Sequence, residues 1–143
     1  MVNIIVTGHG NFATGVLSSM KLIAGEQEGV IGVDFIETDS TSDLEGKIKG
    51  AIKILSDNIL ILSDLAGGSP FKTGVMLSQS MEGKTIKVIS GTNIGMLLEV
   101  ALSKDVLNLD ELVNLAINAG KDAVSIFEMS VLNSNNDDDF DGI

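Results

Sequence analysis

Three Gly-rich, polar segments contain the residues of this chain that could do chemistry. The segment Thr7-Gly8-His9-Gly10 holds the only histidine in 143 residues, and "SDLAGGSP" (63–70) holds the carboxylate of Asp64. A third segment is "SGTN" (90–93). An imidazole nitrogen can attack phosphorus and hold a phosphoryl group covalently. Because a carboxylate that accepts a hydrogen bond from the other ring nitrogen fixes the tautomer, we expect His9 and Asp64 to act as a catalytic pair.

The glycines and small polar residues around this pair are suited to a bound anion. Glycines leave backbone N–H groups open, and helices predicted to begin near residues 11 and 69 would point their positive ends at the same place. The predicted phosphoryl-binding residues are Gly8, Gly10, Gly67, Gly68, Ser69 and Thr92. We expect no metal and no cofactor, because one histidine, no cysteine and no cluster of carboxylates leave too few ligands.

Each feature also has an ordinary structural explanation. A lone histidine is often structural, Asp64 could cap a turn, and "GGSP" (67–70) could be only a tight strand-to-helix connection. Thr92 and Asn93 could be only the cap of the next helix. The glycines beside the histidine favour a functional role, and the convergence of the three segments on one edge of a sheet is the main argument for it.

Apolar runs alternate with amphipathic stretches along the chain, which is typical of an α/β fold. Strands are predicted over 3–6, 30–35, 58–62, 85–90 and 123–129. Helices are predicted over 12–25, 41–55, 69–81, 93–103 and 109–120. The helix over 41–55 would begin with the capping box Ser42-x-x-Glu45, and the helix over 69–81 with Ser69 as N-cap and Pro70 at its first position.

This order predicts a four-stranded parallel sheet covered by helices on both faces. Ligands bind outside the carboxyl ends of such strands, so the three segments should meet at one edge. The run over 123–129 alternates in polarity and predicts a fifth strand at an edge, without indicating whether that edge belongs to its own chain. We expect one domain over 1–130 and an acidic tail over 131–143.

Composition limits the possible partners. Twenty acidic against nine basic residues give a net charge of −11, which argues against nucleic acid or an anionic membrane surface as partner. The absence of cysteine excludes disulfides, thiolate catalysis and zinc–cysteine sites. No basic leader precedes the first strand, and no apolar run approaches the ~18 residues that span a bilayer. We therefore expect a cytoplasmic protein.

Three quoted segments carry a resemblance to a known family. With "TGHGNFATG" (7–15), "DLAGGSPF" (64–71) and "SGTNIGMLLE" (90–99) in this order, the chain resembles the IIA component of the mannose-family sugar phosphotransferase system from residue 1 to about 130. The resemblance implies that His9 is phosphorylated on Nε2. It also implies that Asp64 hydrogen-bonds this histidine and that Ser69 lines the site.

The resemblance also implies a function and an assembly. Such proteins accept a phosphoryl group from the carrier HPr and pass it to the IIB component, which phosphorylates sugar entering through the membrane components IIC and IID. Their fold has four parallel strands and one antiparallel strand, and that strand is exchanged in a homodimer. Lys72 stands where mannose-type members usually carry asparagine, and "TNIGMLLE" (92–99) lacks their proline. The basic residue and the "GTN" loop (91–93) are more similar to members that serve N-acetylgalactosamine or galactosamine, so the resemblance favours an amino sugar such as N-acetylgalactosamine.

Two other functions fit some of the same residues. A phosphoryl donor for a dihydroxyacetone kinase shares this fold and histidine, but its members tend to have serine where this chain has Gly10. A regulatory module that depends on phosphohistidine is the second, and such modules usually lie within longer chains. A metal-dependent hydrolase is disfavoured by the lack of ligands.

Overall fold

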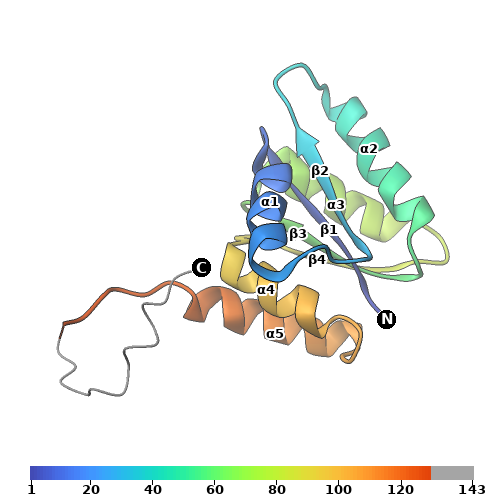
Figure 1. Ribbon diagram of the computed structural model, residues 1–143. Coiled ribbons are helices and arrows are strands. Elements are labelled where there is room, and N and C mark those ends of the chain that lie inside the picture. Colours follow the sequence, from blue (N-terminus) through green and yellow to red (C-terminus); the bar gives the residue numbers. More distant parts are fainter. Residues whose placement is uncertain (130–143) are drawn as a thin grey trace.

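A parallel β-sheet forms the centre of the fold, with the strand order β2-β1-β3-β4 (Figure 1). The computed structural model describes residues 1–129. The strands are β1 (Asn3–His9), β2 (Val30–Phe35), β3 (Asn58–Ser63) and β4 (Thr85–Ile89). The helices are α1 (Phe12–Ala24), α2 (Thr41–Ile54), α3 (Ser69–Ser80), α4 (Ile94–Ser103) and α5 (Leu109–Asp122).

Alternating side chains of the strands build two apolar cores, one on each face of the sheet. Ile4 and Val6 point into a core closed by α1, α4 and α5. Ile5 lies between them in sequence and points into the other core, which α2 and α3 close. Each of these three side chains is fully buried. The predicted four-stranded parallel sheet with helices on both faces is therefore confirmed (Figure 1).

Strand β1 is longer than the prediction of 3–6, and the difference determines where the histidine lies. Pairing with β2 continues to His9, whose register partner is Phe35. A backbone hydrogen bond of 2.7 Å from Gly10 to the carbonyl of Phe35 extends this contact by one residue. The imidazole is therefore attached to the paired end of a central strand, which fixes its backbone.

The starts of two helices differ from the predicted caps. Helix α2 uses Ser40 as N-cap and Asp43 as its reciprocal partner, rather than Ser42 and Glu45. Ser40 and Ser42 each have an acidic residue three positions later, so the sequence pattern does not distinguish them. The N-cap of α3 is Gly68, so Ser69 is the first helical residue rather than the cap.

The predicted fifth strand is not formed by the single chain. In the part of the chain that the structure describes, residues 124–129 have no regular secondary structure, and they follow α5 with their side chains exposed. The exchange of this strand in a dimer stays a prediction. The tail predicted over 131–143 lies outside the described residues. Among residues 1–129, no helix combines the length and apolar character needed to cross a bilayer.

The observed cap of α2 makes a testable prediction about stability. Replacing Ser40 with alanine removes the acceptor for the Asp43 backbone N–H, 3.0 Å away, and should lower the free energy of unfolding by about 1 kcal/mol. Ser42→Ala is the matched control and should change it by less than about 0.5 kcal/mol. Urea unfolding of both variants would check this, and a larger loss for Ser42→Ala would contradict the observed cap.

Candidate functional site

His9 and Asp64 meet at the carboxyl edge of the sheet through two hydrogen bonds to one carboxylate oxygen. Asp64 Oδ2 lies 2.7 Å from His9 Nδ1 and accepts the backbone N–H of His9 at 3.0 Å. The strands β1 and β3 are neighbours, and Thr7, two residues before His9, pairs with Ser63, the residue before Asp64. The parallel register therefore brings a histidine and an aspartate 55 positions apart in sequence into direct contact.

The carboxylate of Asp64 is held in its ionised form. Its side chain is only 12% exposed, and this burial opposes ionisation and raises the pKa. The backbone N–H and Nδ1 of His9 and the N–H of Leu65, which donates to Oδ1 at 2.9 Å, favour the ion and outweigh burial. The pKa of Asp64 is therefore below its ordinary value. A carboxylate held this way is a suitable acceptor for an Nδ1 proton.

The backbone of Gly68 and the ring of Phe35 border the imidazole, which remains partly exposed. A Cβ added to Gly68 would lie 2.6 Å from His9 Cε1 and 3.2 Å from Nε2, so the Gly68 backbone passes close to this edge of the ring. The φ of Gly68 is −79°, which any residue can adopt, so glycine is needed here for space. The His9 side chain is 46% exposed. With Nδ1 engaged by Asp64, Nε2 is the nitrogen left to react.

Phe35 is a site residue that sequence reasoning missed. Its ring centroid lies 5.9 Å from that of His9, with the ring planes tilted by 60°. Phe35 ends the second predicted strand, so its place at the same edge was available from the sequence. Its contact with His9 depends on the strand register, which the sequence alone does not give.

The two helix N-termini predicted to attract an anion differ in the structure. The first turn of α3 has no side-chain cap and no acidic residue, and it begins at Gly68 beside the imidazole. At α1, the carboxylate of Asp34 accepts the backbone N–H of Thr14 at 3.0 Å and its hydroxyl at 2.7 Å. The expectation of two open helix ends is therefore wrong for α1, because a carboxylate from β2 already lies there. Asp34 was missed because this contact also depends on register.

The other predicted glycines have different structural roles. Gly8 is buried, and a Cβ there would meet the ring of Phe12 at 2.5 Å, so glycine allows α1 to pack on β1. Gly10 and Gly67 have φ values of +59° and +81°, with open space around them. Both positions need a backbone conformation that other residues rarely adopt. They shape the two loops on either side of the imidazole.

Thr92 connects two of the loops at this edge. Its side chain is buried, and its hydroxyl donates to the carbonyl of Ser63 at 2.7 Å. The neighbouring N–H of Gly91 donates to the carbonyl of Asp64 at 3.2 Å. Thr92 therefore supports the backbone that carries the aspartate. Ser69, the first residue of α3, lies on the wall of a hollow between α3 and α2.

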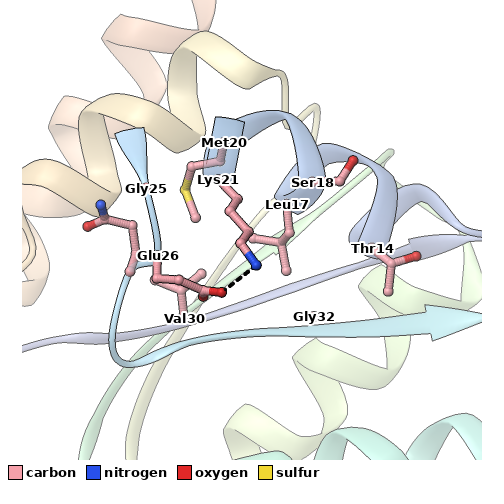
Figure 2. Close-up of a pocket in the computed structure, with 10 residues that line it drawn as sticks. Thr14, Leu17, Ser18, Met20, Lys21, Gly25, Glu26, Val30 and Gly32 are labelled. Carbon is pink, nitrogen blue, oxygen red and sulfur yellow. Dashed lines mark ion pairs between the residues drawn. The ribbon is translucent and has the colours of Figure 1, made fainter. Parts of the chain in front are cut away.

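A separate hollow of about 250 Å³ lies along α1 and β2 and contains none of the predicted site residues (Figure 2). An ion pair of 2.7 Å between Lys21 and Glu26 crosses it, as the dashed line in Figure 2 shows. Leu17 and Met20 give it an apolar wall. Within residues 1–129, no group of three or more His, Asp or Glu side chains is placed to hold a metal ion.

Comparison with known proteins agrees with this geometry. The family model for the PTS system fructose IIA component, where PTS denotes the phosphotransferase system, matches residues 3–117. The fructose-specific EIIA component of Bacillus subtilis is 30% identical over 116 residues, which cover 80% of this chain and 78% of that protein. The mannose-specific EIIAB component of Escherichia coli is 32% identical over 126 residues, and the match spans 86% of this chain but only 38% of that protein.

Two solved structures of IIA components are similar to this chain in fold and sequence. The phosphotransferase system component EIIA from Streptococcus agalactiae is 40% identical, with a TM-score of 0.85 over 89% of this chain and 98% of that one. The mannose/sorbose specific IIA subunit from Enterococcus faecalis is 29% identical, with a TM-score of 0.82 over 92% of this chain and 98% of that one.

The lowered pKa of Asp64 predicts a pH-dependent contribution to stability. Its stabilising effect should be complete above the ordinary aspartate value of 3.8 and should be lost as the pH falls through the lower folded value. At pH 7, Asp64→Asn should lower the free energy of unfolding by about 1–3 kcal/mol, because it removes a charged acceptor that is only 12% exposed. Denaturant unfolding at a series of pH values should show this difference shrinking below about pH 4. A difference that stays constant to pH 3 would contradict it.

Proposed function

This chain belongs to the mannose family of IIA components of the sugar phosphotransferase system, and from that premise we propose that His9 carries the phosphoryl group on Nε2. IIA components of this family are phosphocarriers in sugar uptake. One observation supports the choice of atom most directly. The 2.7 Å contact to Asp64 engages Nδ1, and the half-exposed ring offers Nε2 to a donor.

The proposed step is an in-line phosphoryl transfer. In the neutral imidazole, the proton resides on Nδ1 and is donated to Asp64, so the lone pair on Nε2 is free to attack phosphorus. The bond from phosphorus to the donor nitrogen breaks as the bond to Nε2 forms. The Asp64 carboxylate stabilises the positive charge that develops on the ring. Positioning and electrostatics supply most of the catalysis.

The phosphoryl oxygens would be held by the loops around the ring. The uncapped first turn of α3 presents its positive end at Gly68 and Ser69, next to the Cε1–Nε2 edge of His9. The Ser69 hydroxyl is an additional donor in this proposal, and the turns at Gly10 and Gly67 offer backbone N–H groups. Thr92 is assigned a supporting role through its bond to Ser63. The transfer needs no metal.

The proposed partners follow from the family. Phospho-HPr would be the donor and a IIB component the acceptor, with IIC and IID carrying the sugar through the membrane and the transfer taking place in the cytoplasm. The named relatives act on fructose, mannose or sorbose. For this chain we favour an amino sugar such as N-acetylgalactosamine, on the basis of Lys72 and the "TNIG" segment (92–95).

We also propose that residues 123–129 pair with the sheet of a second copy, forming a homodimer. The side chains of Val124, Ile126 and Met129 are 79%, 81% and 89% exposed, although the segment alternates in the manner of a strand. Strand β4 is an outer strand of the sheet, so one side of it is open to another strand. A second copy would cover the exposed apolar side chains of this segment and supply the edge strand with which the segment pairs.

Phosphorylation by the general enzymes of the system tests the function. Incubation with phosphoenolpyruvate, enzyme I and HPr should place an acid-labile, base-stable phosphate on the wild-type chain. His9→Ala should take up none while still folding cooperatively, and Asp64→Ala should be labelled more slowly. No label on wild type would refute the carrier role, and loss of folding in His9→Ala would make this residue structural.

Sedimentation analysis tests the dimer. The wild-type chain should sediment at twice the monomer mass, and Ile126→Asp should shift it to the monomer, because a charge would be buried in the exchanged strand. Ile54 is 77% exposed on α2, so Ile54→Asp is the matched control and should remain dimeric. A wild-type chain that is monomeric at all concentrations would contradict the proposal.

A further inference from the structure

We propose that the ammonium group of Lys72 binds the phosphoryl group on Nε2 of His9 and neutralises its charge during transfer. The inference rests on the proposed function of His9 and adds a residue that contacts the reacting group. It is carried by the charges at this edge of the sheet, the place of Lys72 on α3 and the hollow that Lys72 and Ser69 line together.

The carboxyl edge of the sheet is acidic, which opposes the arrival of a phosphoryl dianion. The loops and first helical turns there comprise residues 8–12, 34–45, 63–72 and 90–94. Their acidic residues are Asp34, Glu37, Asp39, Asp43, Glu45 and Asp64, and their only lysine or arginine is Lys72. Lys47 reaches the edge from the next turn of α2, but its ammonium is paired with Asp39 at 2.6 Å. Lys72 is therefore the cation available to a phosphoryl group.

The helix directs Lys72 back toward the imidazole. Its backbone N–H donates to the carbonyl of Gly68 at 3.0 Å, so Lys72 stands one turn beyond the residue that borders His9. Side chains on a helix lean toward its N-terminus and cover the preceding turn. A lysine at this position is directed over the preceding turn, and Lys72 lines a hollow together with Ser69 of that turn. In the proposal, its ammonium reaches an oxygen bound to Nε2 from this side.

The position of this lysine is unfavourable for the helix alone. A cation in the first turn opposes the helix dipole, and acidic residues are the ones favoured there. The first turn of α3 has no acidic residue to compensate. Among the ion pairs found in residues 1–129, none includes Lys72. Residues that oppose a local preference of the helix, as this cation opposes the helix dipole, are concentrated at functional sites.

A hollow beside the site gives the side chain room to move. It measures about 270 Å³ and lies between the first turns of α2 and α3. Ser69 and Lys72 form one wall, and Thr41 and Glu45 form the other. Glu45 is the carboxylate among the residues that line this hollow, and no ion pair between it and Lys72 is found. The ammonium group is therefore not held away from the phosphoryl group when it arrives.

A small donor separates contact with the phosphoryl group from contact with a protein partner. Phosphoramidate transfers its phosphoryl group directly to histidine. The lone pair of Nε2 attacks phosphorus, the P–N bond of the donor breaks, and ammonia leaves, while the Nδ1 proton stays hydrogen-bonded to Asp64. This reaction involves no protein surface other than that of the chain itself.

The experiment compares Lys72→Gln and Lys72→Arg with a control of equal charge change. Lys53 lies in the last turn of α2, at the opposite edge of the sheet, so Lys53→Gln supplies that control. Phosphorylation by phosphoramidate and by phospho-HPr is followed in time. The 31P signal of each phosphorylated protein is then titrated, and urea unfolding verifies folding.

Lys72→Gln should slow labelling by both donors about tenfold and raise the pKa of the phosphoryl group, because a nearby cation favours the more negative form. Lys72→Arg should retain most of the rate, and Lys53→Gln should match wild type. Slower transfer from phospho-HPr alone would overturn the proposal and make Lys72 a docking residue. Unchanged rates with both donors would overturn it as well, while leaving His9 as the carrier. A wild-type chain that neither donor labels would refute the proposed function itself, and the role of Lys72 with it.

Discussion

One carboxylate oxygen organises the candidate site. Asp64 Oδ2 accepts both the backbone N–H and Nδ1 of His9, at 3.0 and 2.7 Å, so the same atom fixes the position and the orientation of the ring. An acceptor shared in this way requires two neighbouring strands to end at matching heights. It also requires the loop after β3 to turn back toward β1. Gly91 and Thr92 maintain that turn by donating to the carbonyls of Asp64 and Ser63.

The rest of the fold meets these requirements through the parallel sheet. Side chains alternate along β1, so Ile5 points into the core under α2 and α3, and His9, four residues later, points to the same face. That face also carries the first turn of α3, which is why the uncapped helix end and the imidazole lie together. A slip of one residue in β1 would move the imidazole to the opposite face, where α1 packs. The apolar pattern that buries Ile4 and Val6 therefore also aims the reactive side chain.

Most of the architecture was predictable from the sequence, because the period of apolar residues reports burial directly. The three segments could be placed at one edge because all carboxyl ends of parallel strands lie there. Contacts that depend on register were not predictable, and these include the ring of Phe35 and the capping of α1 by Asp34. The N-cap of α2 was assigned two residues too late because Ser40 and Ser42 offer the same pattern, although the helix begins at Thr41 as predicted. The strand predicted over 123–129 is not formed within the described chain, so its pairing stays a prediction.

The contact between Asp64 and Nδ1 of His9 bears on the regiochemistry of the proposed phosphohistidine. A histidine free in solution presents two nitrogens of similar basicity and can yield two positional isomers. Here a half-turn of the ring would place carbon Cδ2 against Asp64 and leave that buried carboxylate without its side-chain donor. The ring is therefore held in one orientation, and the proposed phosphoryl transfer to His9 would give only the Nε2 isomer. An acceptor protein would then need to recognise a single geometry of the P–N bond.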